Sequence, residues 1–228
     1  MYKITVGICC YKQKNWLHRC LRSLSSQSIP KDEFEVIIVN DDPYEKLDTI
    51  CDNFKDFINI RIINNEENLG LPKSLNKILS ASLGEYFVRV DSDDYVSKHF
   101  LYMLSTFLFM NRSYQAVACD YKKVNDVGES IIPPKTFPKL HKLGFYSAKD
   151  KPMACGVMFT YESLCNIGFY NEEFEMREGH ELMNRFTKKY KLAYLEVPLY
   201  RYRIHDNNRT NNVEKVKKFD KKIGENNE

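Results

Sequence analysis

The chain has 228 residues, of which 43% are hydrophobic and 29% charged, enough for one large domain with a sizeable core or for two small ones. Its 34 basic and 31 acidic residues leave a formal charge of +3 at pH 7, a mixed balance that argues against a dedicated nucleic-acid-binding protein. The longest apolar run, Phe100–Met110, is too short to span a bilayer, so we expect a buried core helix there.

The cysteine usage and the N-terminal stretch bear on location. The seven cysteines are odd in number, include no C-x-x-C pair and mostly stand in apolar runs. This pattern favours buried, reduced thiols over a disulfide scaffold or a zinc site. The opening MYKITVGICCY lacks the apolar stretch and cleavage site of a secretory signal. We therefore expect a cytoplasmic protein.

Strand-like and helix-like segments alternate from the start of the chain. KITVGIC, residues 3–9, is rich in β-branched side chains and predicts a strand, after which Asn15 is placed to cap a helix with apolar residues at helical spacing up to Leu24. FEVIIVN, residues 34–40, is a continuous apolar run of the kind expected for a strand buried on both faces. YEKLDTICDNF, residues 44–54, again has helical spacing.

The alternation continues through a third strand, IRIIN at 60–64, and a third helix, LPKSLNKILSAS at 71–82. Pro72 suits the first turn of that helix and Gly84 is placed to end it. EYFVRV, residues 85–90, predicts a fourth strand. Repeated strand–helix units imply an α/β protein with a mostly parallel sheet covered by helices.

Acidic residues follow two of these strands. NDD at 40–42 ends the second strand and DSDD at 91–94 ends the fourth. Parallel sheets bind ligands beyond the carboxyl ends of their strands. We therefore expect both acidic groups to lie along one rim, close in space.

The pattern loosens after Val124. Residues 125–147 contain three prolines and two glycines, which predicts a long mobile loop that is either a lid beside the site or an ordinary connection. The elements predicted beyond it are a strand at 155–161, a helix at 179–190, and two strands at 191–197 and 199–204 separated by Pro198.

The last residues form a charged tail. Val216, Phe219 and Ile223 recur at near-helical spacing among lysines. We divide the chain into a main domain at 1–212 and a tail at 213–228. The tail is predicted to be a frayed, solvated end, with a short basic helix that touches the inner face of a membrane as the alternative.

The three carboxylates Asp91, Asp93 and Asp94 are too close together to be left without solvent or a cation. The first strand is followed by GICCYKQK, which has no dinucleotide fingerprint, and the chain contains no phosphate-binding loop motif. A calcium loop would need glycine at Val96 and glutamate at Tyr102. What remains is a D-x-D that holds a divalent cation and, through it, a diphosphate, or an acidic turn before a helix.

The chain as a whole resembles the family-two glycosyltransferases of the GT-A fold, from about residue 2 to residue 212. The order and spacing of four stretches carry the resemblance: ITVGICCYKQKNWLHRCLRSLSSQS, FEVIIVNDD, NEENLGLPKSLNKILSASLGEYFVRVDSDD and REGHELMNRFTKKYKLAYLEVPLYRYRIHDNN. The resemblance implies a Rossmann-like, mostly parallel central sheet flanked by helices.

The resemblance also implies roles for individual residues. Asp93 is the expected metal ligand, with the late His205 as a second ligand and Mn²⁺ or Mg²⁺ as the cation. Asp42 matches the acidic residue that bonds the nucleotide base. The remaining donor-binding residues implied by the comparison are Cys9, Tyr11, Lys73, Asp91 and Ser92.

The general base is where the chain departs from the family. Relatives carry an acidic pair at the start of the late helix, whereas the aligned residues here are Glu178 and Gly179. We assign the base to Glu178, with Glu181 one turn further on as the alternative. Further departures at Cys9, Cys10, Lys12 and Pro43 affect the choice of nucleotide.

The resemblance implies a metal-dependent, inverting glycosyltransferase. It would move a sugar from a nucleotide-diphosphate donor to a hydroxyl of a glycan or lipid-linked acceptor, without a nucleic-acid partner. A sugar-phosphate nucleotidyltransferase and a catalytically silent nucleotide-sugar-binding protein are the alternatives.

Overall fold

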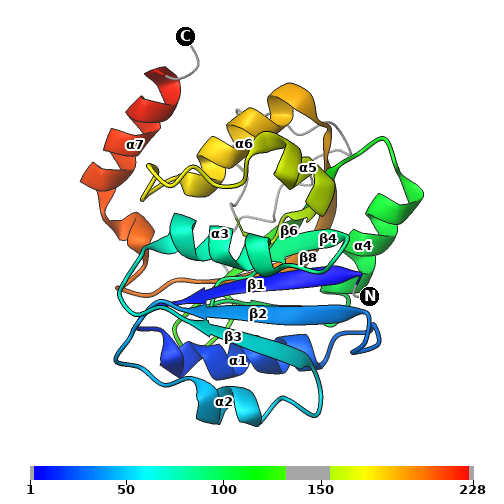
Figure 1. Cartoon of the computed structure of the whole chain (residues 1–228), viewed down its shortest axis with the longest axis vertical. Helices are drawn as coiled ribbons and strands as arrows, with labels where there is room; N and C mark the ends of the chain where they lie inside the picture. The colour runs from blue at the N-terminus through cyan, green and yellow to red at the C-terminus, as the bar shows by residue number, and fades with distance from the viewer. Residues whose placement is uncertain (1–2, 132–154, 226–228) are drawn as a thin grey trace.

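The computed structural model describes residues 3–131 and 155–225, and its centre is one eight-stranded sheet with the strand order β3-β2-β1-β4-β7-β6-β8-β5 (Figure 1). The strands are β1 Ile4–Cys10, β2 Phe34–Asn40, β3 Asn59–Asn64, β4 Tyr86–Arg89, β5 Tyr95–Val96, β6 Ala116–Val124, β7 Met158–Thr160 and β8 Leu192–Arg203. The predicted α/β architecture with a mostly parallel sheet is confirmed.

Helices cover both faces of the sheet. They are α1 Lys14–Ser25, α2 Asp48–Asp52, α3 Leu71–Ala81, α4 Phe100–Met110, α5 Tyr161–Ile167, α6 Glu178–Lys189 and α7 Val213–Glu225, with a 3₁₀ turn at Arg209–Asn211. One apolar cluster joins the sheet to α1, α2 and α4. A second joins its other face to α3, α5 and α6, and Figure 1 shows α3, α5 and α6 opposite α1 and α2.

The strand directions bring one set of ends together. β1, β2, β3 and β4 run parallel, and β6 runs parallel to β8. The short β7 is antiparallel to both β4 and β6. The carboxyl ends of β1, β2, β4, β6 and β8 therefore share one edge, which we call the functional rim.

The local sequence patterns predicted most of the apolar faces. Every residue of β2 is buried, as expected of a strand covered on both sides. The apolar residues of α1 are buried as well (Leu17, Cys20, Leu21 and Leu24). The helix α2 is only five residues long and is shorter than its spacing suggested, and α5 was not predicted.

Two cap predictions are wrong. Asn15 lies inside α1, which begins at Lys14, and the preceding Gln13 uses its side chain elsewhere, on the acidic turn. Gly84 does not end α3, because Ser82 is already extended. Gly84 instead allows close packing, since a Cβ built there would lie 2.5 Å from the backbone nitrogen of Thr5.

Two other expectations need correction. The run Phe100–Met110 is a helix with one buried face rather than a fully buried one, because Tyr102 and Met110 are exposed. The two strands predicted within 191–204 are one strand, β8, from Leu192 to Arg203. Pro198 fits inside β8 because it pairs with Asp120 at a shift in register, where a missing amide hydrogen is tolerated.

The long loop and the tail are placed only in part. Residues 125–131 form a turn closed by a bridge between Val124 and Ser130, and the rest of the predicted lid lies outside the described residues. The tail forms α7 as far as Glu225, and its Phe219 packs against Phe174 and Met176. The apolar side of α7 is thus turned toward the protein.

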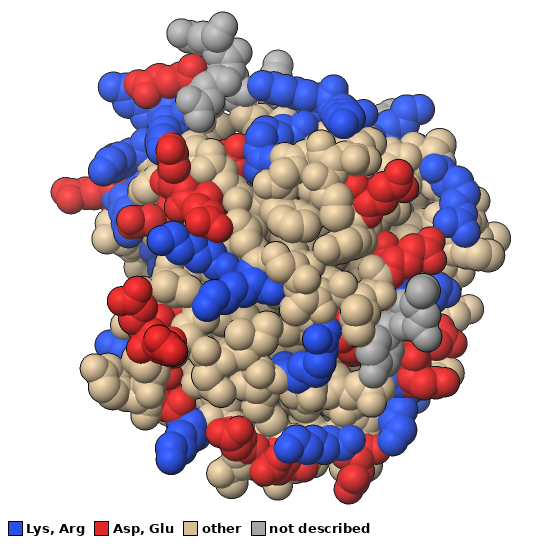
Figure 2. Space-filling model, viewed as in Figure 1, with Lys and Arg blue, Asp and Glu red and all other residues tan. Residues whose placement is uncertain are grey.

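The surface shows no single dominant charge on the face drawn in Figure 2, where basic and acidic side chains are interspersed. Within the described ranges, no helix combines the length and the apolar character needed to cross a membrane.

Candidate active site

The acidic turn after β4, residues 91–94, is attached to β8 by hydrogen bonds. The carboxylate of Asp94 is buried and accepts hydrogen bonds from the Tyr200 hydroxyl at 2.8 Å and the Arg203 amide at 2.7 Å. Nε of Arg203 donates to the backbone oxygen of Asp93 at 2.7 Å. Burial, together with the nearby carboxylates of Asp93 and Asp91, raises the pKa of Asp94. Asp94 therefore anchors the turn.

Asp93 faces a group of side chains from both ends of the chain. Its Oδ2 lies 2.9 Å from Nε2 of His205 and accepts a hydrogen bond of 2.9 Å from the Gln13 amide. The His205 ring stacks on Trp16 with centroids 4.2 Å apart. Gln13 also accepts a hydrogen bond from the buried Ser92 hydroxyl. The structure thus places three of the predicted site residues, Ser92, Asp93 and His205, close together.

The donor atoms of Asp93 and His205 fit a divalent cation chemically. A carboxylate oxygen and an imidazole nitrogen are both common metal ligands. Nδ1 of His205 is buried and has no hydrogen-bond partner in the described structure, so the polar capacity of this ring is not used up by the protein. These two residues are the ones that would hold Mn²⁺ or Mg²⁺.

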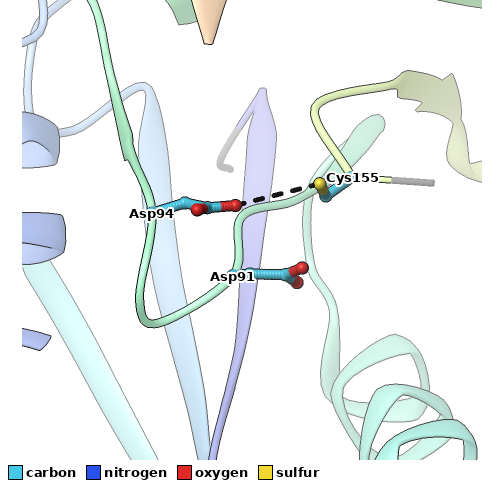
Figure 3. Close-up of side chains that lie close together, drawn as sticks. All are labelled: Asp91, Asp94 and Cys155. Carbon is cyan, nitrogen blue, oxygen red and sulfur yellow. Dashed lines mark hydrogen bonds between the residues drawn. The ribbon is translucent and has the colours of Figure 1, made fainter. Parts of the chain in front are cut away.

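A neighbouring group of side chains also has the spacing of metal ligands, but its atoms already have partners within the protein. Figure 3 shows Asp91, Asp94 and Cys155, whose ligand atoms lie within 4.8 Å of one another. The Asp94 oxygens are bound by β8, the Asp91 oxygens are bound by Arg89, and burial raises the pKa of the Cys155 thiol. We interpret Asp94 and Cys155 as structural parts of the turn, whereas the Asp91 side chain is 25% exposed and its oxygens keep accepting capacity beside Arg89.

Arg89 joins the acidic turn to α6, a link that sequence reasoning missed. Its Nε and Nη2 donate to the two oxygens of Asp91 at 2.5 and 3.0 Å, and its Nη1 donates to Oε1 of Glu178 at 2.8 Å. Burial opposes the charge of Arg89, but the carboxylates of Asp91 and Glu178 raise its pKa above the usual value. An arginine inside the otherwise apolar EYFVRV was the available signal.

The two candidate bases have different surroundings. Glu178 is the first residue of α6 and follows Arg177, whose φ of 65° is left-handed. A second cation, Arg209, lies 3.8 Å from the same Oε1. Glu181 instead forms a two-pronged ion pair with Arg185 at 2.6 and 2.8 Å.

The residues expected to bind the nucleotide follow the carboxyl ends of β1 and β2. Both oxygens of Asp41 are occupied, by the Asn65 side chain at 2.7 Å and by the amides of residues 69 and 70 at 2.9 Å each. Asp42 accepts only the Tyr44 amide, at 3.0 Å, among the described residues. Asp41 therefore holds the segment before α3, and Asp42 keeps an oxygen for a ligand.

The remaining predicted residues lie around the same rim. Cys9, in β1, is half-buried and pairs in register with Val39 of β2. Tyr11 is 41% exposed, with the Lys12 ammonium 5.1 Å from its ring centroid. Lys73 is exposed in the first turn of α3. No contact joins Lys73 to the acidic turn within the described residues.

A mostly parallel sheet with the sequence D-x-D at its functional rim is the combination expected of a glycosyltransferase of the GT-A fold. Residues 5–173 match the model of the glycosyl transferase family 2. The chain belongs to this family.

Named relatives agree with that family. The chain is 33% identical over 138 residues to the poly(ribitol-phosphate) β-N-acetylglucosaminyltransferase TarS of Staphylococcus aureus (strain Mu50). The aligned stretch covers 60% of this chain and 23% of TarS. It is 25% identical over 217 residues to the putative glycosyltransferase EpsH of Bacillus subtilis (strain 168), covering 89% of this chain and 61% of EpsH. The chain thus spans less than two thirds of either relative.

A solved structure has the same fold. The crystal structure of S. aureus TarS 1–349 in complex with UDP-GlcNAc matches with a TM-score of 0.75 at 22% identity, over 92% of this chain and 61% of that one. At this identity the match supports the GT-A fold, and the expected fold family is confirmed.

Proposed function

We propose that the protein transfers a sugar from a nucleotide-diphosphate donor to a hydroxyl group of a glycan or lipid-linked acceptor, in the cytoplasm and with inversion. The observation that carries the proposal is the convergence of Asp93 and His205, 112 residues apart in the chain, at 2.9 Å. Arg89 binds the carboxylate of Asp91, two residues before Asp93, and that of Glu178 at the start of α6. Membership of the glycosyl transferase family supports the same chemistry.

In the proposed site, Asp42 and the residues at the end of β1 bind the nucleotide, and Asp91 orients the ribose or sugar. Asp93 and His205 would hold Mn²⁺ or Mg²⁺. The cation, when bound, supplies positive charge that stabilises a leaving diphosphate.

Glu178 accepts the proton of the acceptor hydroxyl in a single in-line displacement, which inverts the anomeric centre. Its Oε1 is fixed by Arg89, so Oε2 is the oxygen that takes the proton.

The nucleotide and the acceptor are suggested by the relatives. Structures of TarS hold UDP and UDP-GlcNAc, so UDP-sugars are the first donors to test. Two relatives are named as transferases acting on poly(ribitol-phosphate), so polyol-phosphate chains belong in the acceptor panel beside neutral glycans.

The test begins with a thermal-shift screen of UDP, GDP, CDP and dTDP and their sugar conjugates, with and without Mn²⁺. Transfer is then measured by mass spectrometry for the donor that stabilises the protein most. Asp93→Asn should lower turnover by roughly 10² to 10⁴-fold, because a neutral amide replaces the charged carboxylate ligand of the charge-stabilising cation. The exposed Asp52→Asn serves as the matched control. Full turnover with unchanged Mn²⁺ dependence in Asp93→Asn would refute the metal assignment.

Two observations favour a second function. Gly179 stands where relatives carry an aspartate, and Glu178 is engaged by Arg89, both of which suit a silent nucleotide-sugar-binding protein. Calorimetry showing donor binding without transfer or hydrolysis would select it. Release of pyrophosphate from a nucleoside triphosphate would instead select the nucleotidyltransferase alternative.

A further inference from the structure

Arg89 is a buried cation shared by two carboxylates from different parts of the fold. Its side chain is 8% exposed, and its partner Glu178 is 6% exposed. Asp91 belongs to the turn after β4, whereas Glu178 begins α6, 89 residues after Arg89 in the chain. One guanidinium therefore fixes the separation between the acidic turn and the start of α6.

The contacts of the Arg89 guanidinium can orient the two carboxylates as well as neutralise their charge. A guanidinium is planar and presents its donors in a rigid fork, which sets both the position and the plane of a carboxylate. Both oxygens of Asp91 are bound by the fork, at 2.5 and 3.0 Å, while Glu178 is bound through Oε1 alone. A lysine at this position would keep the charge and lose the fork.

We infer that Arg89 is a positioning residue for glycosyl transfer, which holds the donor-side carboxylate of Asp91 and the base Glu178 in one fixed arrangement. This inference rests on the proposed function. It assigns to Arg89 a link between the two halves of the reaction, since Asp91 belongs to the donor side and Glu178 to the acceptor side.

A competing partner makes the arrangement sensitive to change. Arg209 lies 3.8 Å from the same oxygen of Glu178 and its side chain is 44% exposed. Without the Arg89 contact, Arg209 is the cation left beside the Glu178 carboxylate. Arg89 therefore selects which of two cations orients the base.

The chain offers a matched control. Arg61 binds the buried Glu35 through Nε at 3.1 Å and Nη2 at 2.7 Å. This pair joins β3 to the first part of β2, away from the functional rim. Arg61→Lys therefore reports the cost of losing a fork at a structural ion pair.

The experiment compares Arg89→Lys with Arg61→Lys in thermal unfolding, in calorimetry with the best donor of the UDP, GDP, CDP and dTDP sugar panel, and in transfer kinetics. We expect Arg89→Lys to weaken donor binding by about tenfold and to lower kcat by about 30-fold or more. Arg61→Lys should show wild-type binding and kcat. Donor affinity and kcat of Arg89→Lys within about threefold of wild type would overturn the inference.

A second variant covers the case in which Arg89→Lys folds poorly. Arg89→Gln combined with Glu178→Gln keeps the net charge of the cluster, and Glu178→Gln alone is its reference. The double variant should bind donor about tenfold more weakly than the reference, because Asp91 has lost its fork. Equal donor affinity in the two would overturn the inference. Failure of the proposed function appears differently, as a wild-type chain that neither binds nor transfers a sugar nucleotide.

Discussion

The two glutamates at the start of α6 show how partners decide roles. Glu178 reaches the acidic turn through Arg89. Among the described residues, Glu181 forms side-chain contacts with Arg185, which in turn donates to the backbone oxygens of Ile167 and Phe169. Glu181 therefore fixes α6 to the end of α5, whereas Glu178 is joined to the acidic turn.

This difference gives a prediction. Glu178→Gln should lower kcat by roughly 10² to 10⁴-fold, the usual contribution of a general base, with donor binding unchanged. Glu181→Gln should retain most of the activity and instead lower the unfolding temperature, since Arg185 loses a partly buried partner. Both variants are measured at saturating donor and acceptor. Loss of transfer in Glu181→Gln alone would move the base to Glu181.

Gly84 gives a second prediction at the residue scale. Its amide donates to the Thr5 hydroxyl at 3.0 Å, and an added Cβ would meet the Ile4 and Thr5 backbone at 2.6 and 2.5 Å. Gly84→Ala should cost about 1–3 kcal/mol in the free energy of unfolding, because the backbone must shift to make room. Gly224→Ala, with nothing within 4 Å of its Cβ, is the control for urea denaturation. A Gly84→Ala protein as stable as wild type would contradict the packing argument.

At the scale of whole elements, the regular segments were readable from the sequence because their apolar residues have the period of the element that they form. Patterns of this kind predicted β1, β2, α1, α3 and α6. The cap at Asn15 was mispredicted since Gln13, which precedes α1, is used by Asp93 and Ser92. The continuity of β8 through Pro198 depends on its pairing with β6, which no local pattern shows.

The candidate site, like the fold, could be predicted from the sequence only in part. Asp93 and His205 were named from the family resemblance, and the structure brings them together. The link from Arg89 to Glu178 could not be read, because it joins side chains from elements whose relative placement is a property of the fold. Asp94 was one of three clustered carboxylates in the sequence and had no assigned role, and its partners on β8 make it an anchor.

The helix α7 supports the approach to α6. Phe219 packs against Phe174 and Met176, and Asp220 pairs with Arg177 at 3.0 Å, directly before Glu178. The last helix therefore holds the segment that leads into the candidate base.

Phe219→Ala should loosen α7 and the residues before Glu178. The loss of the small apolar cluster should increase hydrogen exchange at 174–177 and 213–225, with a cost of about 3 kcal/mol or less in the free energy of unfolding. Lys217→Ala, at an exposed position of the same helix, is the control. Unchanged exchange at 174–177 would show that α7 does not support this segment.

For the molecule as a whole, buried thiols set the alkaline limit of stability. Burial raises the pKa of Cys10 and Cys119 to about 12 and that of Cys51 to about 11, from an ordinary value of 9.0. The folded chain keeps protons that the unfolded chain releases above pH 9. This contribution to stability is complete below pH 9 and is lost as the pH rises toward 11 and 12.

The free energy of unfolding should therefore fall above pH 9, by up to about 1.4 kcal/mol per pH unit for each such thiol. Urea denaturation between pH 7 and pH 11 measures the slope, and Cys51→Ala should reduce it. At pH 8, iodoacetamide should modify the exposed Cys165 first in the folded chain. Rapid alkylation of Cys10 or Cys119 without unfolding would contradict the burial argument.

The attachment of the acidic turn to β8 also determines when, during synthesis of the chain, this turn can take up its final structure. Asp94 depends on Tyr200 and Arg203, 106 and 109 residues downstream. A nascent chain that has left the ribosome only as far as α6 has an acidic turn whose anchoring residues on β8 have not yet emerged. Contacts this distant in sequence form late, so the acidic turn acquires its anchor only after β8 has emerged and paired with β6.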